Sequence, residues 1–146
     1  MFASLQVAVP PLPTAGVPAS LPSLTPGPAG APNEQLMRAV AAGTSLIGAY
    51  RTHGHLAAHL DPLGSEPPGD PSLEPTSVGL NQTLMAQVPA EILRVAVPGS
   101  TLAEALPHMR HTYCGTIAYE IEHISSHEQR TWLRSQIESG AHLARL

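Results

Sequence analysis

Lysine is absent from this 146-residue sequence, and cysteine, aromatic residues, charge and long apolar runs are all scarce. A single cysteine, Cys114, excludes an intrachain disulfide and any metal site built from cysteines alone. The net charge of −4 argues against binding to nucleic acid, which requires a basic face. No stretch reaches the roughly 18 consecutive apolar residues of a membrane span. The charged fraction of 12% is about half that of an ordinary globular domain, and the length fits either one domain or a smaller domain with a tail.

Proline is abundant instead, and eight of the sixteen prolines lie in residues 1–32, which carry no charged side chain. Such a composition favours polyproline II or irregular backbone, so we predict a disordered Pro/Ala-rich arm over 1–32. The arm is either a plain spacer or a docking ligand for a partner. A signal or transit peptide would carry basic residues, but none occurs before Arg38. The bacterial cytoplasm is therefore the expected location.

The character of the sequence changes at residue 33. Asn33 is a suitable N-cap, and apolar residues recur at helical spacing from Leu36 to Tyr50. The pattern predicts a helix over 33–60, ended by Asp61 and the proline after it. Three glycines weaken this helix, so its stability is expected to come from docking onto a larger body.

The middle of the chain contains loops and two short helices. Residues 65–80 are rich in proline and predict a loop, after which Asn81 can cap a helix that extends through Val88. Thr101 and Glu104 form a capping box that opens a helix over 102–112. Because Pro107 falls inside that helix, we expect a kink or an early stop there.

The C-terminal third predicts a strand and a further helix. Residues 113–124 alternate between apolar and polar side chains, which favours a short half-buried strand, although a helix is an alternative. Ser126 and Gln129 form a second capping box, which opens a helix over 127–139. Gly140 stands where a C-cap glycine is expected.

Histidine is the first candidate for site chemistry, because eight occur in the chain. Pairs spaced three or four residues apart could share a helical face and a metal ion; these are His55 with His59, His108 with His111, and His123 with His127. No H-E-x-x-H motif is present, and a metal site needs a third ligand. Surface or hydrogen-bonding histidines are therefore the favoured interpretation, and no metal ligand is assigned.

Two further groups could carry chemistry. Cys114 could be a nucleophile if a neighbouring cation lowered its pKa, but a small buried thiol is the favoured interpretation. The polar cluster of Thr116, Glu120, Glu122 and His123 could be an acid/base site, but a network that holds two segments together is favoured. The residues alone therefore show no complete active site.

Two long blocks resemble a known family. The first runs from Leu46 to Gly64 and reads LIGAYRTHGHLAAHLDPLG. The second opens with TYCGTI at 112–117, continues with EIEHIS at 120–125, and extends to Ile137 and Glu138. Both blocks, in this order and separation, resemble the 2-oxoglutarate dehydrogenase family, the thiamine-diphosphate-dependent first component of its complex.

The resemblance implies a specific fold and function. Family members decarboxylate 2-oxoglutarate on thiamine diphosphate and Mg²⁺ and transfer the succinyl group to the lipoyl group of the second component, dihydrolipoyl succinyltransferase. The chain would be mainly α, an N-terminal helical and loop segment at 33–146 of a thiamine-diphosphate-dependent α/β enzyme, preceded by the disordered arm. A homodimer is implied for the full-length enzyme.

The chain departs from the family where the chemistry would lie. The thiamine-diphosphate signature and the histidine-bearing segments that hold the 2-oxo acid are absent, so no catalytic, cofactor-binding or metal residue is assigned here. Tyr50, Arg51, His55 and the stretch from Tyr113 to His123 are expected to pack against the catalytic body. Arg51 and His55 are the expected polar determinants of that packing.

Three functional hypotheses follow from the sequence. The chain is the N-terminal part of a 2-oxoglutarate dehydrogenase, and is then expected to be inactive by itself. Alternatively it belongs to a relative that acts on another 2-oxo acid, such as 2-oxoadipate, or that is a plain decarboxylase. The third hypothesis is a free-standing, non-catalytic interaction module that kept the family's docking surface.

Overall fold

The structure, a computed structural model, describes residues 30–145 and is helical, as predicted. Among these residues no strand occurs, and the only β pairing is an isolated bridge between Pro89 and Thr101. The predicted disordered arm over 1–32 lies outside the described residues, apart from 30–32, which begin the described part of the first helix. In the described part, no helix has both the length and the apolar character of a membrane span.

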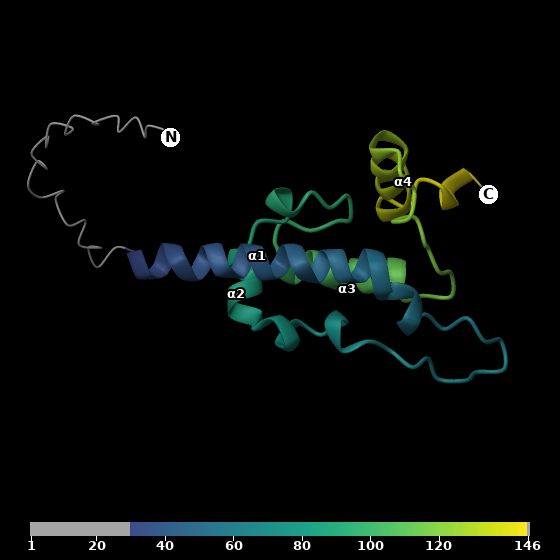
Figure 1. The fold of residues 1–146 in the computed structure, drawn as a ribbon, viewed down its shortest axis with the longest axis horizontal. Coiled ribbons are helices and arrows are strands. Elements are labelled where there is room, and N and C mark those ends of the chain that lie inside the picture. Colours follow the sequence, from purple (N-terminus) through teal and green to yellow (C-terminus); the bar gives the residue numbers. More distant parts are fainter. Residues whose placement is uncertain (1–29, 146) are drawn as a thin grey trace, which may run out of the picture.

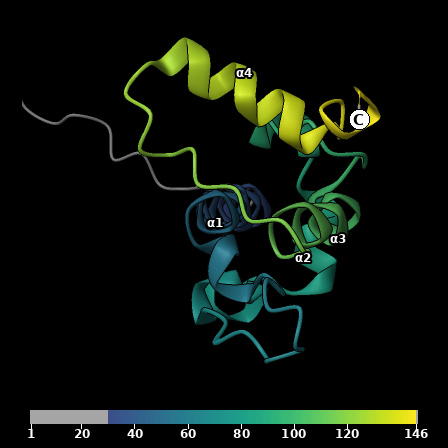
Figure 2. The ribbon, with the colours of Figure 1, turned by 90° about the vertical axis from the view of Figure 1, so that its right-hand side faces the viewer.

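Two long helices, α1 (Gly30–His53) and α3 (Leu102–Tyr113), lie side by side and run in the same direction (Figures 1 and 2). Gly43 approaches Leu102 at the start of α3, and Gly54, just after α1, approaches Tyr113 at its end. The small glycines allow this close contact. The core lies around this pair, and its fully buried side chains include Leu46, Ile47, Tyr50, Leu102, Met109 and Tyr113.

The segment between these helices packs against α1. It contains the short helix α2 (Gln82–Gln87) and four 3₁₀ turns, η1 (Gly54–Ala57), η2 (Pro71–Leu73), η3 (Pro75–Val78) and η4 (Ala90–Leu93). The proline-rich region predicted as a loop is therefore ordered by two of these turns. Tyr50 fixes it to α1, because its hydroxyl donates to the Leu73 carbonyl oxygen at 3.1 Å.

The capping predictions for α2 and α3 are confirmed. The Asn81 side chain accepts from the Leu84 amide at 2.9 Å and caps α2. The Thr101 hydroxyl accepts from the Glu104 amide at 3.4 Å, and the Glu104 carboxylate accepts from the Ser100 amide at 2.7 Å. This box opens α3, which continues through Pro107 to Tyr113, so the expected early stop does not occur.

The last helix, α4 (His127–Glu138), crosses above the α1 and α3 pair (Figure 2). It begins at the predicted cap, where the Ser126 hydroxyl accepts from the Gln129 amide at 3.4 Å. It ends as predicted with Gly140 in the left-handed region at φ +69°. Within α4, the side chain of Ile137 is buried, whereas that of Trp132 is 58% exposed.

Two predicted elements are wrong. Asn33 lies inside α1 and is no N-cap, and the helix ends at His53 rather than near residue 60. The helix ends directly before Gly54, which packs closely against Tyr113 and is the first residue of η1. The strand predicted over 113–124 is the end of α3 followed by turns and irregular chain, because the described residues supply no neighbouring strand. The alternating residues Tyr119 and Ile121 pack instead against the helical core.

Candidate functional site

A buried polar network joins the two sequence blocks. Arg51 on α1 donates through Nε to Oε1 of Glu138 on α4 at 2.7 Å, and Tyr113 donates its hydroxyl to the same oxygen at 3.1 Å. The second carboxylate oxygen accepts from the Ala96 amide at 2.8 Å, and Arg51 Nη2 donates to the Arg94 carbonyl oxygen at 3.1 Å. Glu138 is only 4% exposed, so this network fastens α4 to the rest of the fold.

The electrostatics favour a fixed ion pair. Burial lowers the pKa of Arg51, but its hydrogen bond to Glu138 and the carboxylate charge outweigh burial and hold that pKa above its ordinary value. Burial, reinforced by the charge of Glu138, strongly raises the pKa of Tyr113. The phenol therefore stays neutral near pH 7 and serves as a hydrogen-bond donor. Both carboxylate oxygens already accept hydrogen bonds, an arrangement that suits a structural role better than proton transfer.

Arg51 was predicted to pack against a catalytic body, and the partner that the structure gives it, Glu138, lies within this chain. His55, the second predicted determinant, lies in η1, with Nε2 4.0 Å from a carboxylate oxygen of Glu120. Its Nδ1 atom is buried and has no hydrogen-bond partner among the described residues. Contact of either residue with a catalytic body remains a prediction.

The histidine pairs do not form a metal site. His55 and His59 both lie beyond the end of α1, so they share no helical face. His123 and His127 lie on opposite sides of the Ser126 cap, and His108 and His111 are exposed on α3. Within residues 30–145, no group of three His, Cys, Asp or Glu side chains could hold a metal ion.

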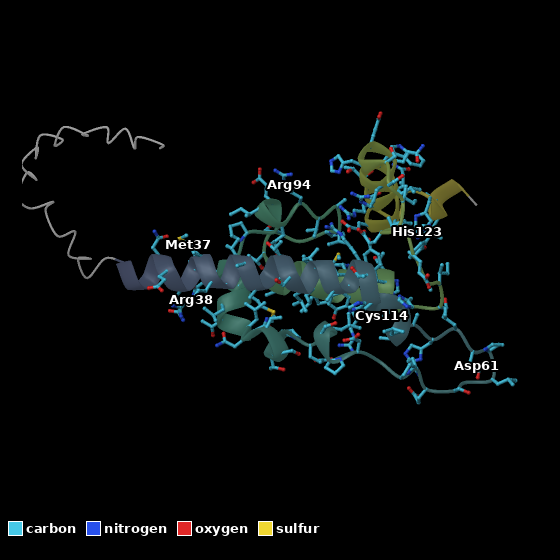
Figure 3. All side chains as sticks on the ribbon, in the orientation of Figure 1. Met37, Arg38, Asp61, Arg94, Cys114 and His123 are labelled. Carbon is cyan, nitrogen blue, oxygen red and sulfur yellow. The ribbon has the colours of Figure 1, made fainter. Side chains whose placement is uncertain are left out.

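The remaining candidates are structural. Cys114 is buried, and burial raises the pKa of its thiol more than nearby Arg110 lowers it, so it is not an activated nucleophile (Figure 3). Glu122 forms ion pairs with Arg130 and Arg134 of α4, with Arg134 Nε donating at 2.8 Å. Glu120 lies near His55 instead, so the four predicted residues do not form one network; Glu122 by itself tethers its loop to α4.

Sequence reasoning missed Glu138 and His142. A glutamate in the last turn of an amphipathic helix ordinarily faces solvent, and its neighbours Arg51 and Tyr113 are far away in sequence. His142 accepts from or donates to the Tyr119 hydroxyl at 2.6 Å, and its Nδ1 lies 2.9 Å from the Gln136 carbonyl oxygen. The only available signal was membership of Tyr113 and Glu138 in the second sequence block.

Comparison with curated proteins yields relatives that share one name, the 2-oxoglutarate dehydrogenase E1 component. The protein from Bacillus velezensis is 33% identical over 107 residues, which cover 72% of this chain and 11% of that protein. The protein from Azotobacter vinelandii is 43% identical over 96 residues, 64% of this chain and 10% of that protein. The one from Brucella anthropi is 39% identical over 102 residues. The chain thus spans about a tenth of these relatives, and no protein-family model matches it.

Proposed function

This chain resembles the N-terminal portion of 2-oxoglutarate dehydrogenase E1 components, and we propose that it serves as that portion of an enzyme which oxidatively decarboxylates 2-oxoglutarate. The similarity in sequence carries the proposal. The network of Arg51, Tyr113 and Glu138 supports it, because all three residues lie in the two blocks that resemble the family. The proposed role is architectural: a helical unit held to a fixed shape at the edge of a catalytic body.

The described residues do not provide a set of ligands for the cofactors of the proposed enzyme. Thiamine diphosphate with Mg²⁺ needs oxygen ligands around the metal and donors for the diphosphate. The half-buried or buried carboxylates Glu122 and Glu138 are both engaged with arginines, and no suitable metal-binding group occurs in the described segment. The residues present do not fit the cofactor, and we assign none of the decarboxylation chemistry to them.

The partners belong to the same proposal. Transfer of the succinyl group to the lipoyl group of a dihydrolipoyl succinyltransferase, assembly as a homodimer, and work in a bacterial cytoplasm follow if the chain is part of such an enzyme. By itself the chain is then expected to be inactive. The alternatives are a relative that uses another 2-oxo acid, such as 2-oxoadipate, and an interaction module without catalysis.

An antibody raised against residues 34–140 separates these possibilities in cells of the source organism. We expect it to capture a polypeptide several times heavier than 15.3 kDa that releases CO₂ from 2-oxoglutarate. Preferential release of CO₂ from 2-oxoadipate would favour the relative with another substrate. A captured protein of the mass of this chain, without decarboxylase activity, would instead support the interaction module and contradict the proposal.

A further inference from the structure

An open cavity of about 500 Å³ lies where α4 crosses α1, and residues 92–96 complete its wall. Its volume is within the range of pockets that hold small molecules. Helix–helix contacts in a core are ordinarily apolar, but here polar side chains face the space from both helices. They are Thr44 and Arg51 from α1, and His127, Thr131, Arg134 and Ser135 from α4. The cavity does not depend on the proposed E1 function.

One arginine in the wall of this cavity has no compensating carboxylate, although the whole chain has a net charge of −4. Arg51, Arg94 and Arg134 line it, and the only carboxylate in the wall is Glu138. Both oxygens of that carboxylate already accept hydrogen bonds, from Arg51, Tyr113 and the Ala96 amide. Glu138 is thus taken up by Arg51, and Arg134 is paired with Glu122 outside the wall, so Arg94 supplies the uncompensated positive charge.

The guanidinium groups of Arg51 and Arg134 are held in fixed orientations, and each keeps N–H donors that have no acceptor among the described residues. Arg51 uses Nε and Nη2, and Arg134 uses Nε and Nη2 toward Glu122, so the Nη1 group of each has no acceptor among the described residues. Arg94 forms no ion pair within residues 30–145. Guanidinium groups held by carboxylates on one side present their remaining N–H groups in a fixed geometry, which suits phosphate or carboxylate oxygens.

We propose that this cavity binds a small dianion bearing phosphate or carboxylate groups, held by Arg94 and by the free Nη1 groups of Arg51 and Arg134. The side chains of Ile92, Leu93 and Val95 form the apolar part of the wall, so the ligand can carry a short apolar portion. Phosphate esters and dicarboxylates share this chemistry, and they are distinguished by direct titration.

The test is an amide NMR titration of the 146-residue chain with inorganic phosphate and, separately, with succinate, at constant ionic strength. We expect saturable shifts confined to residues 92–96 and 127–135, and the tighter of the two probes identifies the class of anion. The variant Arg94→Gly removes the side chain at a residue with φ +52°, a conformation that glycine tolerates better, and it keeps the carbonyl oxygen that Arg51 contacts. It should weaken binding by about tenfold or more, as expected for loss of a charged hydrogen bond.

Arg38→Ala is the matched control, because it removes the same charge from an exposed position on α1 that does not line the cavity (Figure 3). It should change the dissociation constant by less than about twofold, since exposed charges are well screened. Shifts that do not saturate, or equal affinities in the Arg94→Gly and Arg38→Ala variants, would overturn the proposed site.

Discussion

Arg51 Nε and Glu138 Oε1 lie 2.7 Å apart although 87 positions separate the two residues in the chain. The pair joins α1 to α4, and the two side chains are only 12% and 1% exposed. A buried ion pair is costly to break, because the remaining charge stays away from water without a partner.

Glu138→Gln should destabilise the chain by about 3–5 kcal/mol, the usual cost of removing one partner of a buried pair. The measurement is urea unfolding followed by circular dichroism. Glu34→Gln is the matched control, since Glu34 pairs with Arg38 at the surface of α1. It should lower the free energy of unfolding by at most about 1 kcal/mol. Equal destabilisation by the two substitutions would show that the buried pair does not hold α4.

Gly54→Ala should destabilise the fold by about 1–3 kcal/mol, because the new Cβ would lie 2.7 Å from the Tyr113 Cβ and 3.1 Å from its carbonyl oxygen. Gly48→Ala, within α1, offers the opposite case, since its Cβ would meet nothing within 4 Å. That substitution should stabilise by about 0.5–1 kcal/mol through helix propensity. Thermal unfolding of both variants checks the sign, and a stabilising Gly54→Ala would refute the close approach of α1 and α3.

Alkaline pH should unfold the chain and ionise its tyrosines together. Burial is the main cause that raises the pKa of Tyr50, Tyr113 and Tyr119 above the value of about 10 for unfolded tyrosine. The unfolded state therefore loses tyrosine protons first, so the tyrosine contribution to stability is fully present below pH about 10 and is lost as the pH rises further. Tyrosinate absorbance and far-ultraviolet circular dichroism should change in one transition. Tyrosines that ionise near their ordinary pKa in a still helical chain would contradict this.

Cys114 should react slowly with a disulfide reagent in the native chain. Burial raises the pKa of its thiol, so the thiolate fraction at mildly alkaline pH is low and access is restricted. Unfolding in concentrated urea should accelerate the reaction by about tenfold or more, because both restraints are then removed. Equal rates in the two conditions would instead indicate an accessible, activated thiol.

The sequence was sufficient where the determinants are local. Asn81, Thr101, Ser126 and Gly140 each act within a few residues, and all four ends were predicted correctly. The prediction of a strand over 113–124 was wrong. Alternation indicates only that side chains face two environments, whereas a strand also needs a neighbouring strand with which to form backbone hydrogen bonds. The burial of Glu138 escaped prediction because its partners come from distant segments.

If this chain serves as the architectural N-terminal part of a 2-oxoglutarate dehydrogenase E1 component, as proposed, it should replace the matching segment of a relative. The most direct test replaces the matching segment of the Azotobacter vinelandii protein with residues 34–140 of this chain and measures CO₂ release from 2-oxoglutarate. We predict activity within about tenfold of the parent, a loss of about 1.4 kcal/mol at most in transition-state stabilisation. A folded chimera with no more activity than a parent that lacks the segment would contradict the account.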